Sequence, residues 1–258
     1  RDIFEEILNK HFMPKKTNIN QQALFRDTGF KFDSVKEMKE AFQAEAEHPH
    51  EPDLYIYSRY RNPTVVKTEQ KLAKIEGSKW ALLTQSGMSA IDTALSIFQK
   101  GGDTGSWLFF KDIYGGTNSY IDLVLKQQRG IDIHHFESRD GHYDLEAFEK
   151  KVKAIKPELV FFEVVSNPML IVADVNKVIE IAKSAGSKVI IDNTFLTPYT
   201  FKPLEHGADL VVHSVTKYFA GHGDLTAGVL CGNDKKLMQG AIAHRKWIGH
   251  TISPDDAF

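Results

Sequence analysis

The stretch "DLVVHSVTKYFAGHGDLTAGVL", residues 209–230, places a single lysine directly after an apolar run. The run "DLVVHS" (209–214) has the length and β-branched content of a strand, and the residues after Lys217 are rich in glycine and small side chains. A lysine at the end of a buried strand either extends its amine to solvent or serves as a nucleophile. The residues that come after the other strands decide between these two roles.

Five more apolar runs lie upstream, and each has the composition of a strand. They are "WALLT" (80–84), "SWLFF" (106–110), "IDIHHF" (131–136), "ELVFFEV" (158–164) and "KVIID" (188–192). Between them, helical spacing relates Met88, Ile91, Leu95 and Phe98, and also Val175, Val178, Ile179 and Ala182. This alternation predicts a doubly wound α/β domain with a mostly parallel sheet and helices on both faces. Cys231, beside "AGVL", is interpreted as a buried strand residue.

The first 62 residues do not follow this pattern. They predict a helix at 34–46, followed by "EHPHEPDLYIYSRYRNPT" (47–64), which is polar, aromatic and rich in proline. Such a segment is typical of an extended arm rather than a core element. We therefore divide the chain into an N-terminal helix and arm, residues 1–62, and a large domain, residues 63–258.

The composition is that of a globular protein and excludes several classes of function. The 258 residues are 42% hydrophobic and 26% charged, with a net charge of −2 and no basic stripe that would indicate nucleic acid or an anionic membrane. The apolar runs fall far short of the roughly 20 residues that span a bilayer. The start, "RDIFEEILNKHF", lacks the apolar core of a signal peptide. We expect a cytoplasmic protein.

Two of the predicted strands are followed by residues suited to a bound ligand. After "WALLT", a Ser-Gly turn opens a helix, so the N–H groups of Gly87 and Met88 could bind an anion, although plain helix capping explains the same residues. After "SWLFF", Tyr114 precedes two glycines that let the backbone approach a ligand closely. A turn tyrosine packed on its neighbours is the alternative.

Three further strands end in polar groups. Asn167 follows "ELVFFEVV", and Asp192 ends "KVIID", where a carboxylate needs either a cationic partner or a helix to cap. Ser214 and Thr216 place hydroxyls beside Lys217. Because ligands bind beyond the carboxyl ends of strands in open α/β sheets, these groups are expected to converge on one site.

The set as a whole matches the needs of pyridoxal phosphate. Its aldehyde condenses with a lysine, its phosphate sits on a helix N-terminus, an aromatic ring covers it, and a carboxylate pairs with its pyridinium nitrogen. A metal enzyme is disfavoured, because His134 and His135 are adjacent on a strand and point to opposite faces.

With these residues the chain resembles the Cys/Met-metabolism family of pyridoxal-phosphate enzymes, whose members include cystathionine γ-lyase, cystathionine γ-synthase and methionine γ-lyase. The matching stretches are "YSRYRNPT" (57–64), "QSGMSAI" (85–91), "YGGT" (114–117), "SNP" (166–168), "DNTFLTP" (192–198), "HSVTKYFAGHGD" (213–224) and "SPDDAF" (253–258). The resemblance implies fold type I and a homodimer or homotetramer.

Carried over by position, the resemblance also implies a role for each site residue. Lys217 is the Schiff-base lysine, Asp192 the partner of the pyridine nitrogen, and Tyr114 the ring stacked on the cofactor. The phosphate ligands implied are Gly87, Met88, Ser214 and Thr216, joined by Tyr57 and Arg59 from the neighbouring subunit. Asn167 is placed at the cofactor's phenolic oxygen, with Glu163 as support nearby.

The sequence departs from the family pattern in three places. Arg61 stands where many relatives have glycine, and Gly116 stands where methionine γ-lyases commonly have cysteine. Family members continue past "SPDDAF" into a smaller C-terminal domain whose arginine binds the substrate carboxylate, and the sequence stops before it. Within the chain, Arg59 and Arg61 are the candidates for the arginine that binds the substrate carboxylate, and the resemblance assigns Arg59 to the phosphate. We therefore expect the 258 residues alone to turn over amino acids poorly.

Three functions remain open. The first is a carbon-sulfur lyase of transsulfuration, acting on cystathionine or a related amino acid by β- or γ-elimination, in which Lys217 moves the Cα proton. The second is a γ-replacement synthase, such as cystathionine γ-synthase or O-acetylhomoserine sulfhydrylase. The third is a cofactor-binding fragment or scaffold without catalysis.

Overall fold

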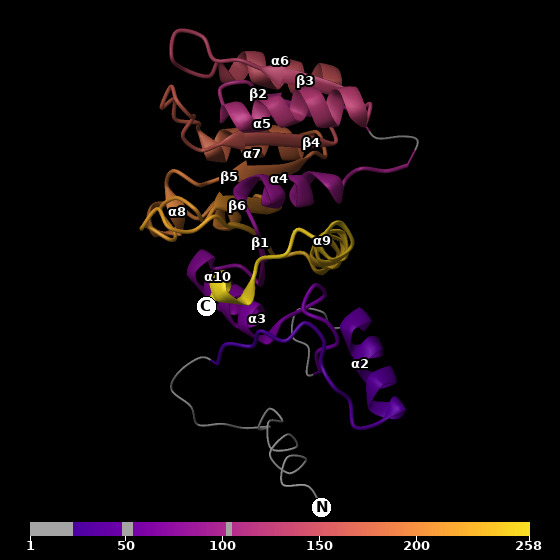
Figure 1. The fold of residues 1–258 in the computed structure, drawn as a ribbon. Coiled ribbons are helices and arrows are strands. Elements are labelled where there is room, and N and C mark those ends of the chain that lie inside the picture. The colour runs from indigo at the N-terminus through magenta and orange to yellow at the C-terminus, as the bar shows by residue number, and fades with distance from the viewer. Residues whose placement is uncertain (1–22, 48–53, 102–104) are drawn as a thin grey trace, which may run out of the picture.

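The computed structural model describes residues 23–47, 54–101 and 105–258, which are built around a seven-stranded sheet (Figure 1). The strands lie in the order β1-β7-β6-β5-β4-β2-β3. All neighbours from β6 to β3 pair in parallel, whereas β7 runs antiparallel to both β1 and β6. The bounds are β1 Trp80–Thr84, β2 Trp107–Phe110, β3 Ile133–Phe136, β4 Leu159–Glu163, β5 Lys188–Asp192, β6 Leu210–Ser214 and β7 Gly228–Gly232.

The six strands predicted from apolar runs are all present, with ends shifted by at most two residues. β7 contains the buried Cys231, so the interpretation of that residue as part of a buried strand is confirmed. The antiparallel direction of β7 was not predicted. It results from the connection between β6 and β7, which consists of turns and bends instead of the helix that a parallel crossover needs.

Helices connect most of the strands and pack beside the sheet. α2, Val35–Glu47, is the helix predicted at 34–46. α7 contains the whole of its predicted helical pattern, and α4 contains Met88, Ile91 and Leu95 but ends before Phe98, which lies in a turn. No described helix is long and apolar enough to cross a membrane. The remaining bounds are α3 Pro63–Glu76, α4 Gly87–Ser96, α5 Gly115–Tyr120, the π-helix Ile121–Gln128, α6 Leu145–Ile155, α7 Val175–Ser184, α8 Thr197–Thr200, the 3-10 helix Pro203–His206, α9 Lys235–Ile248 and α10 Pro254–Ala257.

The end of the predicted arm starts a helix. Asn62 caps α3, because its side-chain oxygen accepts hydrogen bonds from Thr64 N at 2.9 Å and Val65 N at 3.4 Å, and Pro63 occupies the first helical position. α3 ends at Gly77, whose φ of 77° is favourable for glycine. Asn62 itself still has an extended backbone, with φ −124° and ψ 137°, and the helix begins at the next residue. Its part at residues 48–53 lies outside the described residues.

The two faces of the sheet are covered by different helices. On β6, His213 Nε2 lies 2.8 Å from Glu76 Oε2 of α3, and both side chains are fully buried. The next residue, Ser214, points the other way, toward Gly87 at the start of α4. α3 and α4 therefore lie on opposite faces, and the face with α4 carries the polar residues that end the strands.

The core is most aromatic around β2 and β4. Phe110 lies at the centre, with ring centroids 5.2 Å from Phe162, 5.3 Å from Phe136, 5.3 Å from Phe148 and 4.7 Å from Tyr143. These rings are buried in the structure, and such pairs add stability beyond the area they bury. The sheet is thereby a rigid base for the loops at its carboxyl edge.

Candidate active site

A cavity of about 350 Å³ opens at the carboxyl ends of β4, β5 and β6, beside the start of α4. Its walls include all of the predicted site residues except Tyr57 and Arg59. The predicted residues that line it are Gly87, Met88, Tyr114, Asn167, Asp192, Ser214, Thr216 and Lys217, and Glu163 joins them. The structure thus brings together groups that are as far apart in the sequence as residues 87 and 217.

The start of α4 forms one wall, and it is packed tightly against the sheet. Ser86 caps the helix by accepting a hydrogen bond from Ser89 N at 3.1 Å. A Cβ atom at Gly87 would lie 2.9 Å from Ser214 Cβ, and one at Gly228 would lie 2.2 Å from Ser86 O. Only glycine fits at these positions, and the backbone N–H groups at the N-terminus of α4 are held at the cavity.

Two carboxyl groups lie side by side on the floor of the cavity, because Glu163 of β4 pairs in register with Asp192 of β5. Asp192 Oδ1 accepts hydrogen bonds from Thr194 N at 2.9 Å and from Thr194 Oγ1 at 2.6 Å. Thr194 Oγ1 in turn accepts one from Ser214 N at 2.8 Å, which ties the carboxylate to β6. Thr194 was missed in the sequence, although its position two residues after Asp192 is that of a side chain closing a turn.

Glu163 orients two other residues of the cavity. One of its oxygens accepts a hydrogen bond from Tyr114 N at 2.8 Å, and the other accepts one from Asn167 N at 3.1 Å. Burial raises the pKa of Glu163 to about 8, and the adjacent Asp192 carboxylate contributes to this rise. Burial also raises the pKa of Asp192. A cation bound at this floor would stabilise both ionised forms.

Rising pH is expected to destabilise the cofactor-free chain through Glu163. Between its ordinary pKa of 4.5 and the folded value of about 8, the folded chain holds a proton that the unfolded chain has lost. The stability contributed by this group is therefore complete below pH 4.5 and is lost as the pH rises toward 8. The loss is at most about 1.4 kcal/mol per pH unit. Urea unfolding at several pH values should show a smaller slope in Glu163→Gln; equal slopes would mean that Glu163 titrates normally.

Tyr114 is half exposed at the mouth of the cavity, directly before α5. Its ring lies against Gly116, where a Cβ atom would be 2.4 Å from Tyr114 Cε1. Any side chain at residue 116, including the cysteine of methionine γ-lyases, would therefore require the ring to shift. Gly116 sets the present position of the aromatic wall.

Lys217 follows β6 in a turn and borders the cavity, but the lysine itself is exposed. Its neighbour Thr216 fixes the turn, because Thr216 Oγ1 donates to Ala227 O at 3.1 Å and accepts from Ala227 N at 3.0 Å. Among the described residues, no ion pair holds the Lys217 amine. The strand before the lysine is buried as predicted, whereas the lysine side chain is accessible to a ligand.

Tyr57 and Arg59 lie outside the cavity. Arg59 Nη1 donates a hydrogen bond to Lys246 O of α9 at 2.6 Å, and its guanidinium stacks 5.5 Å from the ring centroid of Tyr57. Arg61 is buried, with Nη2 2.8 Å from Glu69 Oε2. Neither arginine points into the cavity of its own chain, so neither serves there as a ligand for a substrate carboxylate.

The cavity has the chemistry that pyridoxal phosphate requires. The N-terminus of α4 offers N–H donors for a phosphate, Lys217 offers an amine for an aldehyde, and the Asp192 carboxylate offers a partner for a pyridinium cation. The Glu163 and Asp192 carboxyls lie side by side at the floor, where a bound pyridinium cation would offset the burial that raises their pKa values. The residues present therefore fit the cofactor.

Comparison with known proteins gives the same result. The sequence model of the Cys/Met metabolism PLP-dependent enzymes matches residues 7–258. An L-methionine gamma-lyase of Porphyromonas gingivalis is 35% identical over 91% of the chain and 56% of its own length. A cystathionine beta-lyase of Lactococcus lactis is 37% identical over 81% of the chain and 52% of its own length. The chain thus spans about half the length of the curated relatives it matches.

A solved structure supports the match in three dimensions. The cystathionine gamma synthase of Xanthomonas oryzae pv. oryzae, in complex with aminoacrylate and cysteine, superposes with a TM-score of 0.78 at 31% identity. The alignment covers 91% of the chain and 55% of the synthase. Sequence, fold and cavity agree, and the chain belongs to the Cys/Met metabolism family of enzymes that depend on pyridoxal phosphate.

Proposed function

We propose that the protein is a carbon-sulfur lyase of sulfur amino-acid metabolism, which cleaves cystathionine or a related amino acid by β- or γ-elimination. The observation that carries this proposal is the convergence of Lys217, Asp192, Tyr114 and the start of α4 on one cavity. Bound pyridoxal phosphate would supply an electron sink for a carbanion at Cα. Relatives named methionine gamma-lyase and cystathionine beta-lyase favour a sulfur-containing substrate.

The residues of the chain have distinct parts in this proposal. Lys217 would hold the cofactor through its amine, and Nζ, when free, would accept the Cα proton of the substrate. Asp192 would pair with the pyridine nitrogen, Tyr114 would cover the ring and assist proton transfer, and Asn167 would contact the phenolic oxygen. The phosphate is held by Gly87, Met88, Ser214 and Thr216. For Thr216 this requires its hydroxyl to exchange its bonds with Ala227 for bonds to the phosphate.

Borohydride reduction is expected to fix the cofactor on Lys217. Among the lining residues of the cavity it is the one lysine, and its amine has no ion-pair partner among the described residues. Peptide mapping after reduction should show the cofactor mass on the peptide that contains Lys217, and Lys217→Ala should lose it. Labelling of any other lysine would refute the assignment.

Product analysis tests the reaction itself. The full-length protein should release a keto acid, ammonia and an amino-acid thiol from cystathionine, or a keto acid, ammonia and hydrogen sulfide from homocysteine. A second candidate is γ-replacement, which is favoured by the likeness to the Xanthomonas synthase and to a cystathionine gamma-synthase/O-acetylhomoserine (thiol)-lyase of Bacillus subtilis, 35% identical over 79% of the chain. If an added thiol is incorporated into the product of O-acetylhomoserine at the expense of keto acid, the protein is a synthase.

We also propose that two copies of the chain complete each other's sites, as a homodimer or within a homotetramer. Tyr57 and Arg59 offer a hydroxyl and a guanidinium that suit a phosphate, yet they lie outside the cavity of their own chain. A two-fold axis would let each arm serve the neighbouring cavity. A cytoplasmic location is proposed on the composition, which includes a single buried cysteine.

A further inference from the structure

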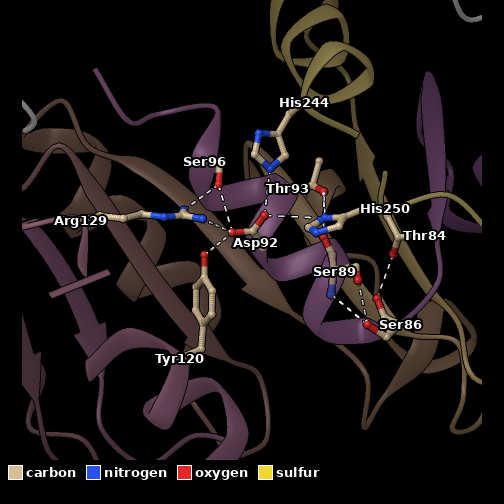
Figure 2. Close-up of polar contacts among 10 residues, drawn as sticks. All are labelled: Thr84, Ser86, Ser89, Asp92, Thr93, Ser96, Tyr120, Arg129, His244 and His250. Carbon is tan, nitrogen blue, oxygen red and sulfur yellow. Dashed lines mark hydrogen bonds and ion pairs between the residues drawn. The ribbon is translucent and has the colours of Figure 1, made fainter. Parts of the chain in front are cut away.

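Asp92 is the centre of a polar cluster on α4, away from the cavity. The carboxylate is 7% exposed. Its Oδ1 accepts hydrogen bonds from Tyr120 Oη, from Arg129 Nη2 at 2.7 Å and from Ser96 Oγ at 3.2 Å. On the other side, His244 Nε2 lies 2.8 Å from Asp92 Oδ2 (Figure 2). We call Asp92, Ser96, Tyr120, Arg129, His244 and His250 the Asp92 cluster.

The cluster joins four separate segments of the chain. Asp92 belongs to α4, Tyr120 ends α5, Arg129 follows the π-helix, and His244 lies on α9. α4 begins at the proposed phosphate site, and α5 begins directly after Tyr114, the proposed cover of the ring. The bond between Tyr120 and Asp92 therefore links two helices whose N-termini form two walls of the cavity.

A second path leads from the cluster to the start of α4. His250 Nδ1 lies 3.6 Å from Asp92 Oδ2 and 3.4 Å from Thr93 Oγ1. Thr93 Oγ1 donates to Ser89 O at 2.7 Å, and Ser89 Oγ lies 2.9 Å from Oγ of Ser86, the residue that caps α4 (Figure 2). These contacts connect the cluster with the start of α4 through Thr93 and Ser89, whose backbone O and side-chain Oγ take part in separate bonds.

The charges in the cluster are balanced by hydrogen bonds. Although burial alone would raise the pKa of Asp92, hydrogen bonds from His244, Tyr120 and Arg129 hold it well below its ordinary range. Burial lowers the pKa of His250, and Arg129 and His244 add to this effect while Asp92 opposes it. Asp92 therefore accepts hydrogen bonds as an anion from Ser96, Tyr120, Arg129 and His244. A buried network whose polar groups are satisfied in this way is rigid.

The spacing of Asp92, His244 and His250 would also suit a divalent cation. However, Oδ1 of Asp92 is occupied by a guanidinium and a phenol, and a cation bound at Oδ2 would stand close to the Arg129 charge. A hydrogen-bonded anion explains each contact without a metal. A bound cation is therefore one outcome that the test must distinguish.

We propose that Asp92 is a positioning residue for the cofactor, which fixes the N-terminus of α4 and Tyr114 at the separation that the cofactor needs. The proposal rests on the proposed placement of the phosphate at Gly87 and of the ring at Tyr114. It assigns a role in the site to a side chain that does not line the cavity.

The test is pyridoxal phosphate binding to Asp92→Asn in the full-length protein. The asparagine side chain has nearly the volume of aspartate but no charge. Both oxygens of Asp92 accept hydrogen bonds, so the amide NH₂ group must face donors on one side and those bonds are lost. Affinity for pyridoxal phosphate should fall about tenfold, the effect of losing hydrogen bonds to a charged group. At saturation, the induced circular dichroism of the bound cofactor should weaken, because the ring is no longer held in one orientation. Asp122→Asn, which removes a half-exposed carboxylate from the adjacent π-helix, should change neither quantity.

Three other results would decide against the proposal, and a second variant covers the case in which Asp92→Asn does not fold. Wild-type affinity and dichroism in Asp92→Asn, with a lowered melting temperature, would show that the cluster only stabilises the fold. If this variant does not fold, Tyr120→Phe removes one donor and should weaken binding by about threefold; wild-type binding there overturns the proposal. Stabilisation of the wild type by Zn²⁺ that is lost in His244→Gln and His250→Gln would assign a cation site instead. Borohydride labelling away from Lys217 in the wild type would refute the cofactor placement itself, a result that does not depend on Asp92.

Discussion

Asp192→Asn is expected to slow removal of the Cα proton by two or more orders of magnitude while leaving part of the cofactor bound. The carboxylate lies at the end of β5 with Oδ1 held by Thr194, so an asparagine can keep the same position. Only the negative charge is lost, and with it, under the proposed role of Asp192, the pairing that would keep the pyridine nitrogen protonated and the ring electron-poor. An effect of this size, roughly 3 kcal/mol or more in the barrier, is typical of a group that acts in the transition state.

Loss of Cα deuterium from a labelled substrate measures this step directly. Asp122→Asn, at a half-exposed position on the π-helix, is the matched control for removal of one negative charge. A near-normal exchange rate in Asp192→Asn would mean that the ring nitrogen has a different partner. Retention of the cofactor, followed by its absorbance, separates a slow reaction from an empty site.

Mixing two inactive variants, Arg59→Ala and Lys217→Ala, is expected to restore roughly a quarter of wild-type activity, by a symmetry argument. After joint unfolding and random reassembly, about half of the dimers are mixed. If Arg59 serves the partner's cavity, each mixed dimer holds one site with both groups intact. The structure is compatible with this arrangement because Arg59 donates a hydrogen bond to Lys246 O and does not line the cavity of its own chain.

An arm that acts on its own chain predicts a different outcome. Every site in a mixed dimer would then lack either Arg59 or Lys217, and no activity would return on mixing. Each variant must first be shown to be inactive and dimeric alone. Arg26→Ala serves as a matched control, because Arg26 is an exposed arginine paired with Asp255 and should leave activity unchanged.

The strands and the residues after them could be predicted because each is marked by a local pattern. Strands such as β1 and β4 are buried along their whole length, so their sequences contain few polar positions, and the ends of parallel strands meet at one edge. That rule alone groups Asn167, Asp192 and Lys217. The helical patterns at 87–96 and 175–184 are equally local.

Other features depend on contacts between distant segments and left no such pattern. Asn62 caps α3, but the residues before it are polar, aromatic and rich in proline. The sequence therefore predicts an extended arm there and does not indicate where the helix begins. The exposure of Lys217 depends on the turn that Thr216 and Ala227 close. The Asp92 cluster unites residues from 92 to 250, and no single segment of the sequence marks it.

The place of β7 in the sheet has a consequence for how the protein is made. β7 is the last described strand in the sequence, yet it lies between β1 and β6, and Trp80 Nε1 at the start of β1 donates to Asp234 O, 154 positions later. On the ribosome, β1 has no neighbouring strand to pair with until β7 has emerged, and contacts of such long range form slowly. Ser86, the cap of α4, follows β1 closely and packs against Gly228 of β7, so the proposed phosphate site is completed only with β7. A nascent chain should therefore become able to retain pyridoxal phosphate only after synthesis passes Gly232, and until then the apolar "WALLT" edge needs protection from aggregation.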